Sequence, residues 1–351
     1  MLTVALVFGG ASSEHSVSCV TALGVMSAID QSKYKIVPIG ITKSGKFVHQ
    51  AIDPGWTLGQ SPEVTSTKEV RLTPGSPVVN IAGEEISLDL VFPLLHGPNG
   101  EDGSVQGLIQ LLGIPYVGNG VLASALAMDK SKAKACYRDA GIRVAEELVI
   151  YRTDWELGRE AELSRAKEFA ATDVFVKPSR SGSSVGVSLV RNLDQLEEAI
   201  ELALAHDQTA LIEKRIIGRE VECSVLEHPN GSLEVSLAGE IIVQGRDFYD
   251  YEAKYLGGGA DLIVPTKLED AELHEMQDLA KRAFRALGCS GLARTDFFLT
   301  KQGFVLTEVN TMPGFTPISM YPALFEASGT SYSELVETLI LTGLKKGTEP
   351  R

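Results

Sequence analysis

The strongest constraint on the fold is a local pattern that occurs twice in the first third of the chain. An apolar segment at 2–8 is followed by a glycine turn, an apolar helical segment at 17–29 and a second apolar segment at 34–42. The same order of strand, loop, helix and strand recurs between 88 and 118. Successive units of this kind are typical of a parallel sheet with helices packed on it. We therefore predict a mixed α/β protein that begins with a parallel sheet.

The character of the chain changes twice beyond this region. Residues 47–85 are rich in Pro, Gly, Ser and Thr and predict a loop with a hairpin that turns at Ala82-Gly83. Helical segments begin at Leu122 and lead to two strands joined by the loop SRSGSS, and later strands alternate with hairpin turns. At roughly 100 to 200 residues per domain, the 351 residues suggest two or three domains. We expect three, with bounds at 1–120, 121–215 and 216–351.

The composition limits the classes of function. The net charge is −14 and the pI is about 5.0, whereas sequence-independent binding to nucleic acid or to an anionic membrane needs a basic surface. The N-terminus lacks the basic segment of a signal peptide, and no apolar run approaches the ~20 residues of a spanning helix. The four cysteines form no C-x-x-C pair, which argues against a disulfide framework or a cysteine metal site. We therefore predict a cytoplasmic protein with small-molecule partners and neither nucleic acid nor membrane as a partner.

A predicted hairpin near the C-terminus gathers polar side chains on one face. The turn KQG predicts a three-residue loop with glycine in the left-handed conformation, and counting back places Asp296 opposite Glu308 and Arg294 opposite Asn310. Opposed carboxylates repel one another unless a cation lies between them, and Asp, Glu and Asn oxygens suit Mg²⁺. On this pattern alone, a magnesium site and a solvent-facing polar surface neutralised by Arg294 both remain open.

A second candidate site follows the predicted strand that carries Lys177. A lysine before a flexible Ser/Gly loop can place an ammonium and several backbone N–H groups around a phosphate, although the order is not that of a Walker A loop. Taken alone, an ordinary hairpin loop is the simpler interpretation. A dinucleotide site is disfavoured, because the Gly9-Gly10 turn lacks the G-x-G-x-x-G spacing and the second strand ends in Gly40-Ile41-Thr42 without an acid.

Two loops at the expected carboxyl edge of the parallel sheet carry further polar residues. Glu14 and His15 lie in one loop, and His96 and Glu101 lie in the other. Ligands of open α/β sheets bind at this edge, where Glu14 could hold a substrate ammonium. We expect His15 to be a polar surface residue. For His96, a functional role and a structural hydrogen bond both fit.

Eight motifs extend over nearly the whole chain: FGGASSEHSVS, LHGPNGEDGSVQG, AMDK, VKPSRSGSSVGV, EKRIIGREVE, FYDYEAKY, ARTDFF and EVNTMPGFTPISMYP. In this order they resemble the D-alanine:D-alanine ligases of the ATP-grasp superfamily. The resemblance implies an ATP-grasp fold with an N-terminal Rossmann-like domain on the substrate side. Residues 121–215 and 216–351 would then be the central and C-terminal ATP-grasp subdomains, with ATP between their sheets.

The resemblance also implies the nucleotide and metal contacts by motif position. Two lysines would contact the ATP phosphates, one segment would present backbone groups to adenine, and an acid would bind the ribose; these are Lys130 and Lys177, then Glu213, Lys214 and Ile216, then Glu220. Two Mg²⁺ ions, which Mn²⁺ could replace, would be held by Asp296, Glu308 and Asn310.

The implied reaction has two steps. The carboxylate of one D-alanine attacks the γ-phosphate of ATP to give D-alanyl phosphate, and the amine of a second D-alanine then displaces phosphate. Arg294 and the backbone N–H of Gly314 would stabilise the oxyanion. Glu14 would hold the first ammonium with His96 nearby. Ser319 and Met320 would bind the second carboxylate, mainly through the backbone, although the family commonly has leucine at Met320.

The aromatic and charged stretch DFYDYEAKY, at 247–255, follows neither the strand nor the helix period, and the resemblance gives it the role of a lid. Phe248 would face the nucleotide and Lys254 a phosphate or the substrate carboxylate. Tyr255 and Ser183 would form a hydrogen-bonded set with Glu14. Closure would keep water away from the acyl phosphate.

Two alternatives are close to this interpretation. A ligase that accepts D-lactate would form an ester, but such members replace the lid tyrosine, so Tyr255 favours an amine substrate. A nucleotide-binding protein without chemistry, acting as a sensor or scaffold, would tolerate loss of an acid from the hairpin, where all matched residues remain. The family is commonly dimeric, which predicts a homodimer.

Overall fold

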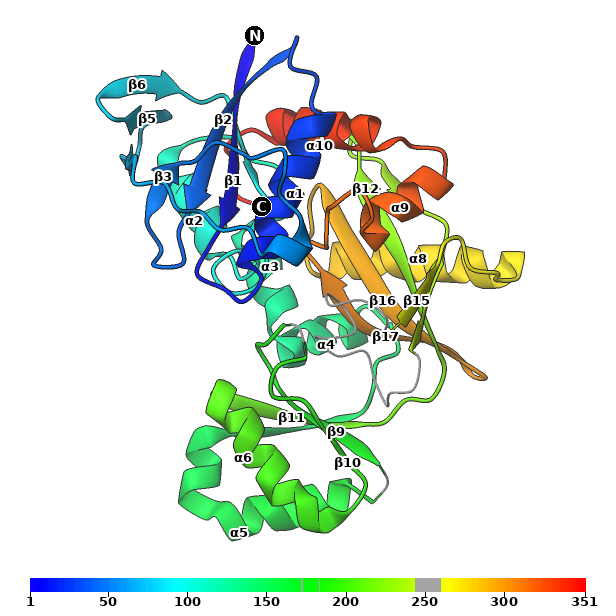
Figure 1. Ribbon diagram of the computed structural model, residues 1–351. Coiled ribbons are helices and arrows are strands. Elements are labelled where there is room, and N and C mark those ends of the chain that lie inside the picture. Colours follow the sequence, from blue (N-terminus) through cyan, green and yellow to red (C-terminus); the bar gives the residue numbers. More distant parts are fainter. Residues whose placement is uncertain (172, 183, 244–259) are drawn as a thin grey trace.

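The computed structural model describes residues 1–171, 173–182, 184–243 and 260–351 (Figure 1). Two of the three main sheets lie together in the upper part of Figure 1, and the third lies apart below them with α5 (Arg152–Phe169) and α6 (Leu196–His206). Both chain termini lie in the upper part. Among the described residues, no helix combines the length and apolar character needed to cross a membrane.

The N-terminal sheet has the strand order β3-β2-β1-β7. Strand β1 pairs in parallel with both β2 and β7, which confirms the parallel sheet predicted from the repeated units. Residues of α1 and α10 (Tyr332–Lys346) pack on one face of this sheet and residues of α2 on the other, so β1 is buried continuously from Val4 to Phe8 rather than on alternate residues. The elements are β1 (Leu2–Gly9), α1 (His15–Ala28), β2 (Tyr34–Ile41), β3 (Phe47–His49), β7 (Leu90–Pro93) and α2 (Ser104–Leu112).

Two local predictions for this region had different outcomes. The hairpin at Ala82-Gly83 is confirmed: both residues have positive φ, 53° and 93°, and join β5 to β6. The strand expected at 114–118 is wrong, because only Tyr116 bridges Val91 before Gly118, at φ 92°, turns the chain away. The small sheet comprises β4 (Val70–Leu72), β5 (Val78–Ile81) and β6 (Glu84–Ser87), preceded by η1 (Leu58–Gln60).

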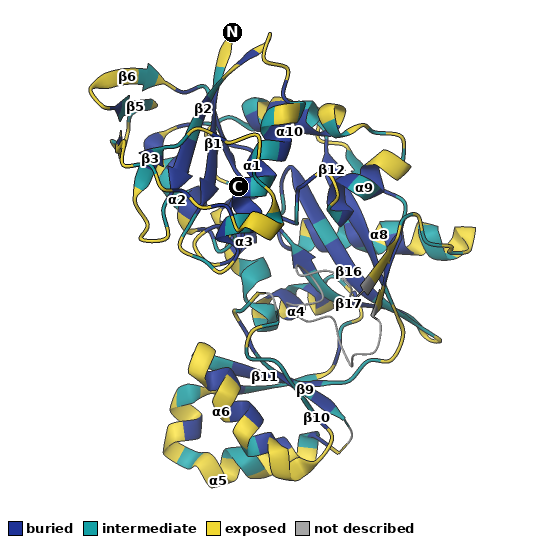
Figure 2. Ribbon diagram, in the orientation of Figure 1, coloured by how far each residue is buried: buried dark blue, intermediate teal, exposed yellow. Residues whose placement is uncertain are grey.

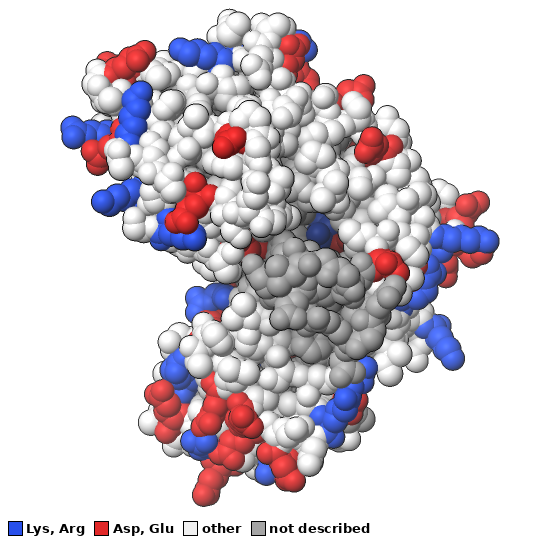
Figure 3. Space-filling view, viewed as in Figure 1, with Lys and Arg blue, Asp and Glu red and all other residues white. Residues whose placement is uncertain are grey.

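The central sheet has the order β10-β9-β11-β8, and each of its pairings is antiparallel. Helices α5 and α6 pack on it, with the outer sides of both helices exposed (Figure 2). Acidic and basic side chains are interspersed over this part on the face seen in Figure 3; Arg159 of α5 ion-pairs with Glu197 of α6 at 2.7 Å. The strands are β8 (Glu147–Tyr151), β9 (Val174–Pro178), β10 (Ser188–Val190) and β11 (Thr209–Lys214), with η2 (Leu193–Gln195) before α6.

The C-terminal sheet has the order β15-β14-β12-β16-β17, with β13 beside β12. Its last helix, α10, begins with a capping box in which Ser331 and Glu334 exchange side-chain to backbone hydrogen bonds. The elements are β12 (Arg219–Glu227), β13 (Leu233–Val235), β14 (Gly239–Val243), β15 (Ala260–Ile263), α8 (Asp270–Ala286), β16 (Leu292–Thr300), β17 (Gly303–Asn310), α9 (Met320–Ala327) and α10 (Tyr332–Lys346).

The β16–β17 hairpin has the predicted polar pairs but not the predicted turn. Thr300 pairs with Gly303, so the turn is one residue shorter than expected. A bulge at Thr307, just after the Asp296 pair, restores the register. Asp296 therefore lies opposite Glu308, and Arg294 opposite Asn310, as predicted.

The hydrophobic cores show which parts of the molecule are joined. One core combines β1 and β7 with residues of β12, β16, α9 and α10, so the N-terminal and C-terminal sheets share it. The linking helices α3 (Val121–Met128) and α4 (Lys130–Asp139) lead to the central sheet, and Ala133 and Tyr137 of α4 belong to a second core with α8 and the β16–β17 hairpin. The core of the central sheet contains residues between Leu148 and Ile212.

Candidate active site

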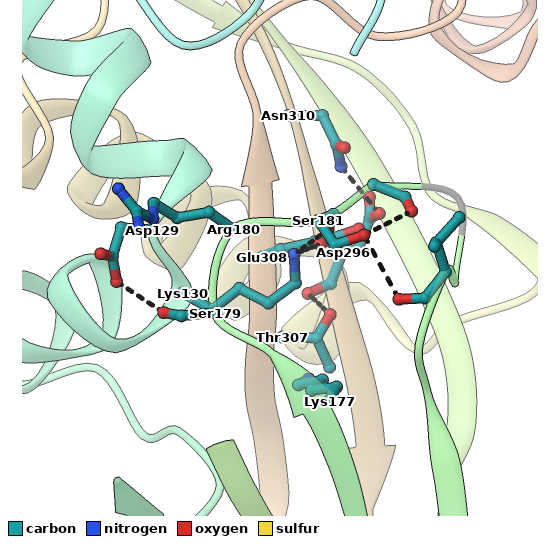
Figure 4. Close-up of polar contacts among 12 residues, drawn as sticks. Asp129, Lys130, Lys177, Ser179, Arg180, Ser181, Asp296, Thr307, Glu308 and Asn310 are labelled. Carbon is teal, nitrogen blue, oxygen red and sulfur yellow. Dashed lines mark hydrogen bonds and ion pairs between the residues drawn. The ribbon is translucent and has the colours of Figure 1, made fainter. Parts of the chain in front are cut away.

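Predicted site residues from three elements converge in Figure 4: the β16–β17 hairpin, the N-terminus of α4 and the loop after β9. Lys130 extends from α4 between the hairpin acids and this loop. Its Nζ donates to the Ser181 carbonyl at 2.8 Å and lies 3.8 Å from Glu308 Oε2. This lysine therefore connects the central sheet to the hairpin that carries the acids.

The N-terminus of α4 is fixed against the same loop. Asp129 is the N-cap, and its Oδ1 accepts hydrogen bonds from Lys132 N at 3.2 Å and from the Ser179 hydroxyl at 2.7 Å. The Lys130 backbone N–H also donates to the Ser179 carbonyl at 3.1 Å. These bonds orient Lys130 towards the site.

Asp296 is held by an arginine from the same strand. Arg294 donates Nε and Nη2 to the two carboxylate oxygens of Asp296, each at 2.7 Å. Asn310 Nδ2 donates to Asp296 Oδ2 at 2.9 Å, and the Thr307 hydroxyl donates to the Asp296 carbonyl at 2.7 Å. The bulge residue thus helps to fix the acid that the sequence places opposite Glu308.

Glu222 of β12 is a third acid in this row and was missed by the sequence interpretation. It lies directly opposite Asp296, is 2% exposed, and its Oε2 is 2.5 Å from Arg294 Nε. Burial raises the pKa of Glu222, Arg294 opposes the shift, and Asp296 adds to it. Burial also works against the charge of Arg294, but Asp296 and Glu222 outweigh it and raise the pKa of the guanidinium.

The second predicted phosphate lysine belongs to a buried ion-pair network. Lys177 Nζ lies 2.7 Å from Glu213 Oε2, and Lys134 Nζ, which the sequence interpretation also missed, lies 2.5 Å from Glu213 Oε1. Burial alone would raise the pKa of Glu213, but the two ammonium groups lower it to about 2. Burial lowers the pKa of Lys134, against the opposing effect of Glu213. Glu213 is therefore a stable anion.

The segment predicted to meet adenine leads from β11 towards β12. The Lys214 ammonium lies 5.1 Å from the centroid of the Phe169 ring, and its backbone N–H donates to the Glu146 carbonyl at 3.1 Å. Ile216 is half-buried in the following loop. Glu220, near the start of β12, pairs with Phe298 of β16. The sequence predicted backbone recognition of adenine here, and this remains a prediction.

Glu14 lies where loops from two sheets approach each other. It is the N-cap of α1 and is 8% exposed. A Cβ on Gly97, which has φ 75°, would lie 2.6 Å from Glu14 Oε2, so both the backbone conformation and the space require glycine. A Cβ on Gly182 would lie 3.8 Å from the same oxygen, which places Glu14 beside the loop after β9.

Both histidines of the sheet edge are buried by the protein. His96 is 4% exposed, its Nδ1 lies 3.2 Å from the Met312 carbonyl, and its Nε2 lies 3.1 Å from the Thr21 hydroxyl. Burial lowers the pKa of His96 and favours the neutral ring, which fits the structural hydrogen bond considered above. His15 is 1% exposed and bonds Gly10 and Val64, so its expected surface position is wrong.

The predicted site for the second carboxylate is the N-terminus of α9. The Ser319 side chain bonds Thr316 at 2.7 Å and does not cap the helix. The Met320 side chain is 5% exposed and packs with Ile241 and Leu324. A Cβ on Gly314 would lie 3.2 Å from Ser319 Oγ, so the predicted oxyanion donor and this helix terminus are adjacent. Helix N-termini favour anions through their unpaired N–H groups.

Ser183, Phe248, Lys254 and Tyr255 lie outside the described residues, as does the whole stretch 247–255. In the described part of the chain, no group of three or more His, Cys, Asp and Glu residues is close enough to hold a metal. The predicted metal set has a different composition, two carboxylates and one amide, and its oxygen donors on adjacent strands suit Mg²⁺.

The three-sheet arrangement and the lysine and acid residues between the sheets define an ATP-grasp fold, and solved structures of ligases share it. The VanG D-Ala:D-Ser ligase from Enterococcus faecalis has a TM-score of 0.86 and 36% identity, with 97% of this chain and 99% of that chain covered. The D-alanine-D-alanine ligase from Coxiella burnetii has a TM-score of 0.82 and 31% identity, with 99% and 94% covered.

The sequence comparisons identify a single family within this fold. Residues 3–119 match the family model described as D-ala D-ala ligase N-terminus, and residues 136–341 match the corresponding C-terminus model. The D-alanine--D-alanine ligase of Mycolicibacterium vanbaalenii is 46% identical, with 99% of this chain and 98% of that protein covered. That of Mycobacterium ulcerans is also 46% identical, with 99% and 96% covered. The chain belongs to the D-Ala-D-Ala ligase family.

Proposed function

We propose that this protein is a cytoplasmic D-alanine:D-alanine ligase that uses ATP to make D-alanyl-D-alanine for peptidoglycan. The observation that carries the proposal is the position of Lys130, whose ammonium lies between the loop after β9 and Glu308. This geometry suits a phosphate held between two sheets. Full-length similarity to ligases of that name supports the substrate.

The nucleotide and its metal ions would bind at this boundary. Lys130 and Lys177 would hold the phosphates, and Asp296, Glu308 and Asn310 would hold two Mg²⁺ ions, or Mn²⁺ in their place. Mg²⁺ bound there would neutralise charge on the phosphates. The adenosine part would lie along the segment 213–216, with Glu220 on the ribose.

In the first step, Glu14 would hold the ammonium of one D-alanine so that its carboxylate points at the γ-phosphate. His96 would support this position through its hydrogen bonds to Thr21 and the Met312 carbonyl. The carboxylate oxygen attacks phosphorus, the bond to ADP breaks, and D-alanyl phosphate forms. Alignment of the two reactants and cancellation of the phosphate charge by the lysines lower the barrier.

In the second step, the N-terminus of α9, at Ser319 and Met320, would hold the carboxylate of a second D-alanine. Its amine attacks the acyl carbonyl, loses a proton, and phosphate leaves. Arg294 and the Gly314 N–H would stabilise the oxyanion. Ser183 and Tyr255 would complete the closed site with Glu14, while Phe248 and Lys254 from the lid would meet the nucleotide.

D-serine and D-lactate are the alternatives to D-alanine as the second substrate. The neighbour with TM-score 0.86 is named as a D-Ala:D-Ser ligase, so D-serine is a candidate acceptor. The lid tyrosine, Tyr255, argues against the D-lactate acceptor considered above. Phosphate release should therefore be measured with ATP and Mg²⁺ plus D-alanine alone, or D-alanine with D-serine or D-lactate. We expect D-alanine alone to suffice, and absence of D-alanine-dependent release would reject the proposal.

Glu308→Gln gives a sharper test of the metal assignment. The Glu308 side chain is 33% exposed and its ion pair with Lys130 is 3.8 Å long, so its loss should change the free energy of unfolding by less than about 1 kcal/mol. We expect kcat to fall by about 100-fold or more. Glu326→Gln, on the exposed side of α9, is the matched control. Wild-type turnover in Glu308→Gln would remove this residue from the metal site.

The proposed ligase would have three domains and would form a dimer. The substrate-side domain would be 1–120, the central ATP-grasp subdomain 121–215 and the C-terminal subdomain 216–351, and two copies would form a homodimer. Sedimentation of the purified chain tests the dimer, and limited proteolysis near residues 120 and 215 tests the domain bounds.

A further inference from the structure

Behind the predicted phosphate lysine, five charged side chains alternate in sign. Lys177 contacts Glu213 at 2.7 Å, Glu213 contacts Lys134 at 2.5 Å, and Lys134 lies 3.5 Å from Glu147. Arg138 ends the series, 3.0 Å from the other oxygen of Glu147. The series thus has three cations and two anions, with Lys177 at the end near the site.

The middle of the series is buried and its ends are more accessible. The Lys134 side chain is 2% exposed and that of Glu147 is 5%, compared with 19% for Lys177 and 48% for Arg138. A buried carboxylate that loses all of its cationic partners is strongly destabilising. Glu213 has two such partners, so one of them can leave while the other keeps its charge compensated.

The two lysines on Glu213 come from different parts of the molecule. Lys177 is in β9 and pairs with Leu211 of the neighbouring strand β11, two residues before Glu213. Lys134 comes from α4, whose Ala133 and Tyr137 pack with the C-terminal sheet. The partner that stays on Glu213 is therefore fixed to the other side of the boundary where the nucleotide would bind.

We propose that Lys134 is a positioning residue for phosphate binding: it stays on Glu213 and so allows Lys177 to leave this carboxylate for a phosphate of the nucleotide. The inference rests on the proposed function, because it needs a nucleotide phosphate beside Lys177. Without Lys134, Glu213 would depend on Lys177 for its compensation, and a phosphate would have to compete with a buried carboxylate for the same ammonium. The phosphate, rather than the adenosine part, would then lose affinity.

Direct binding of ADP and adenosine to the full-length protein, measured by calorimetry, separates this role from a structural one. Lys134→Met should raise the Kd for ADP by about tenfold or more and leave the Kd for adenosine within about twofold. Lys134→Arg keeps the charge and should restore most of the ADP affinity. Lys132→Met, on the same helix but exposed, is the control for loss of a lysine.

The double variant Lys134→Met/Glu213→Gln provides the second test. Removing the carboxylate frees Lys177 again, so the ratio of the ADP and adenosine Kd values should return towards the wild-type ratio. The double variant lacks the charges of both Lys134 and Glu213, so neither of these two groups is left buried without its partner. It therefore keeps the test available if Lys134→Met does not fold. Equal loss of ADP and adenosine affinity in Lys134→Met, or a double variant that still binds ADP tenfold more weakly than wild type, overturns the proposal.

These measurements do not depend on turnover. If wild type binds ADP but releases no phosphate with D-alanine, the proposed function fails while the role of Lys134 is still tested. If wild type turns over normally and Lys134→Met binds ADP like wild type, the role of Lys134 fails alone.

Discussion

The C-terminal sheet meets its two neighbours in very different ways. With the N-terminal sheet it shares one apolar core, in which Phe92 and Phe315 contact edge to face at 6.2 Å. Towards the central sheet, the contacts around α4 are polar, as in the bonds of Lys130 to Ser181 and of Lys134 to Glu213. Apolar burial is lost when such surfaces separate, whereas a polar partner can be replaced by a ligand. The predicted phosphate lysines lie on the polar boundary.

Two matched leucines test this difference most strongly. Leu335 of α10 and Leu196 of α6 are both fully buried, the first in the shared core and the second in the core of the central sheet. Replacing either by alanine should lower the free energy of unfolding of its own region by about 2–5 kcal/mol. Because α10 packs against both β7 and β12, Leu335→Ala should accelerate amide exchange in both strands.

The contrast is the result for Leu196→Ala. Its effect on exchange, followed by mass spectrometry, should be confined to the central sheet, including β9 and β11. Equal acceleration in β1, β12 and β9 by both variants would show that the three sheets unfold as one unit, and the distinction between the two boundaries would be lost.

Asn119 is a polar side chain at the apolar boundary between the N-terminal and C-terminal sheets. Its replacement should lower the free energy of unfolding less than the leucine replacements can. It is 4% exposed, donates Nδ2 to the carbonyls of Leu292 and Thr311, each at 2.7 Å, and accepts from Ser290 N at 2.8 Å. Asn119→Ala leaves three buried backbone groups without these partners, which should cost about 3 kcal/mol. Urea unfolding of Asn119→Ala and wild type measures this difference in the free energy of unfolding.

The matched control is Asn192→Ala, which removes an exposed N-cap and should cost about 1 kcal/mol or less. If Asn119→Ala costs no more than this control, the boundary between the N-terminal and C-terminal sheets depends on apolar packing alone.

The hairpin shows how far local sequence patterns reach. The period of two and the position of Gly303 were enough to predict that Asp296 lies opposite Glu308. The turn itself was wrong, because its length and the bulge at Thr307 are set together. An extra residue in β17 compensates for the shorter turn, and nothing in the local pattern distinguishes that residue from its neighbours.

The two missed residues needed contacts between distant segments. Glu222 shares a strand face with Glu220, which could have marked it, but its register with Asp296 joins strands far apart in the chain. Lys134 lies one helical turn after Lys130, and that spacing was visible. Its partner Glu213 is 79 residues away, so only the packed structure shows why a lysine is buried there.

Glu101 tests the side of the N-terminal sheet that faces the site, and its expected effect depends on pH. Its Oε2 accepts from Gly97 N at 2.6 Å, while burial, reinforced by the nearby Glu14, raises its pKa to about 8. The ordinary value is 4.5, so the folded protein holds a proton that the unfolded chain has released between these two pH values. Glu101 therefore favours folding at low pH, and this contribution declines as the pH rises towards about 8.

Glu101→Gln should keep the hydrogen bond from Gly97 and remove this titration. The free energy of unfolding of Glu101→Gln relative to wild type should therefore increase from pH 5 to pH 8. Its slope should approach the value for a difference of about one bound proton between the folded and unfolded states. Urea unfolding across this range measures it, with Glu85→Gln, exposed on β6, as the control. If the free energy of unfolding has the same pH dependence in wild type and Glu101→Gln, the ionised carboxylate is tolerated beside Glu14. The N-terminal side of the site would then accommodate a change of charge as readily as the polar boundary around α4.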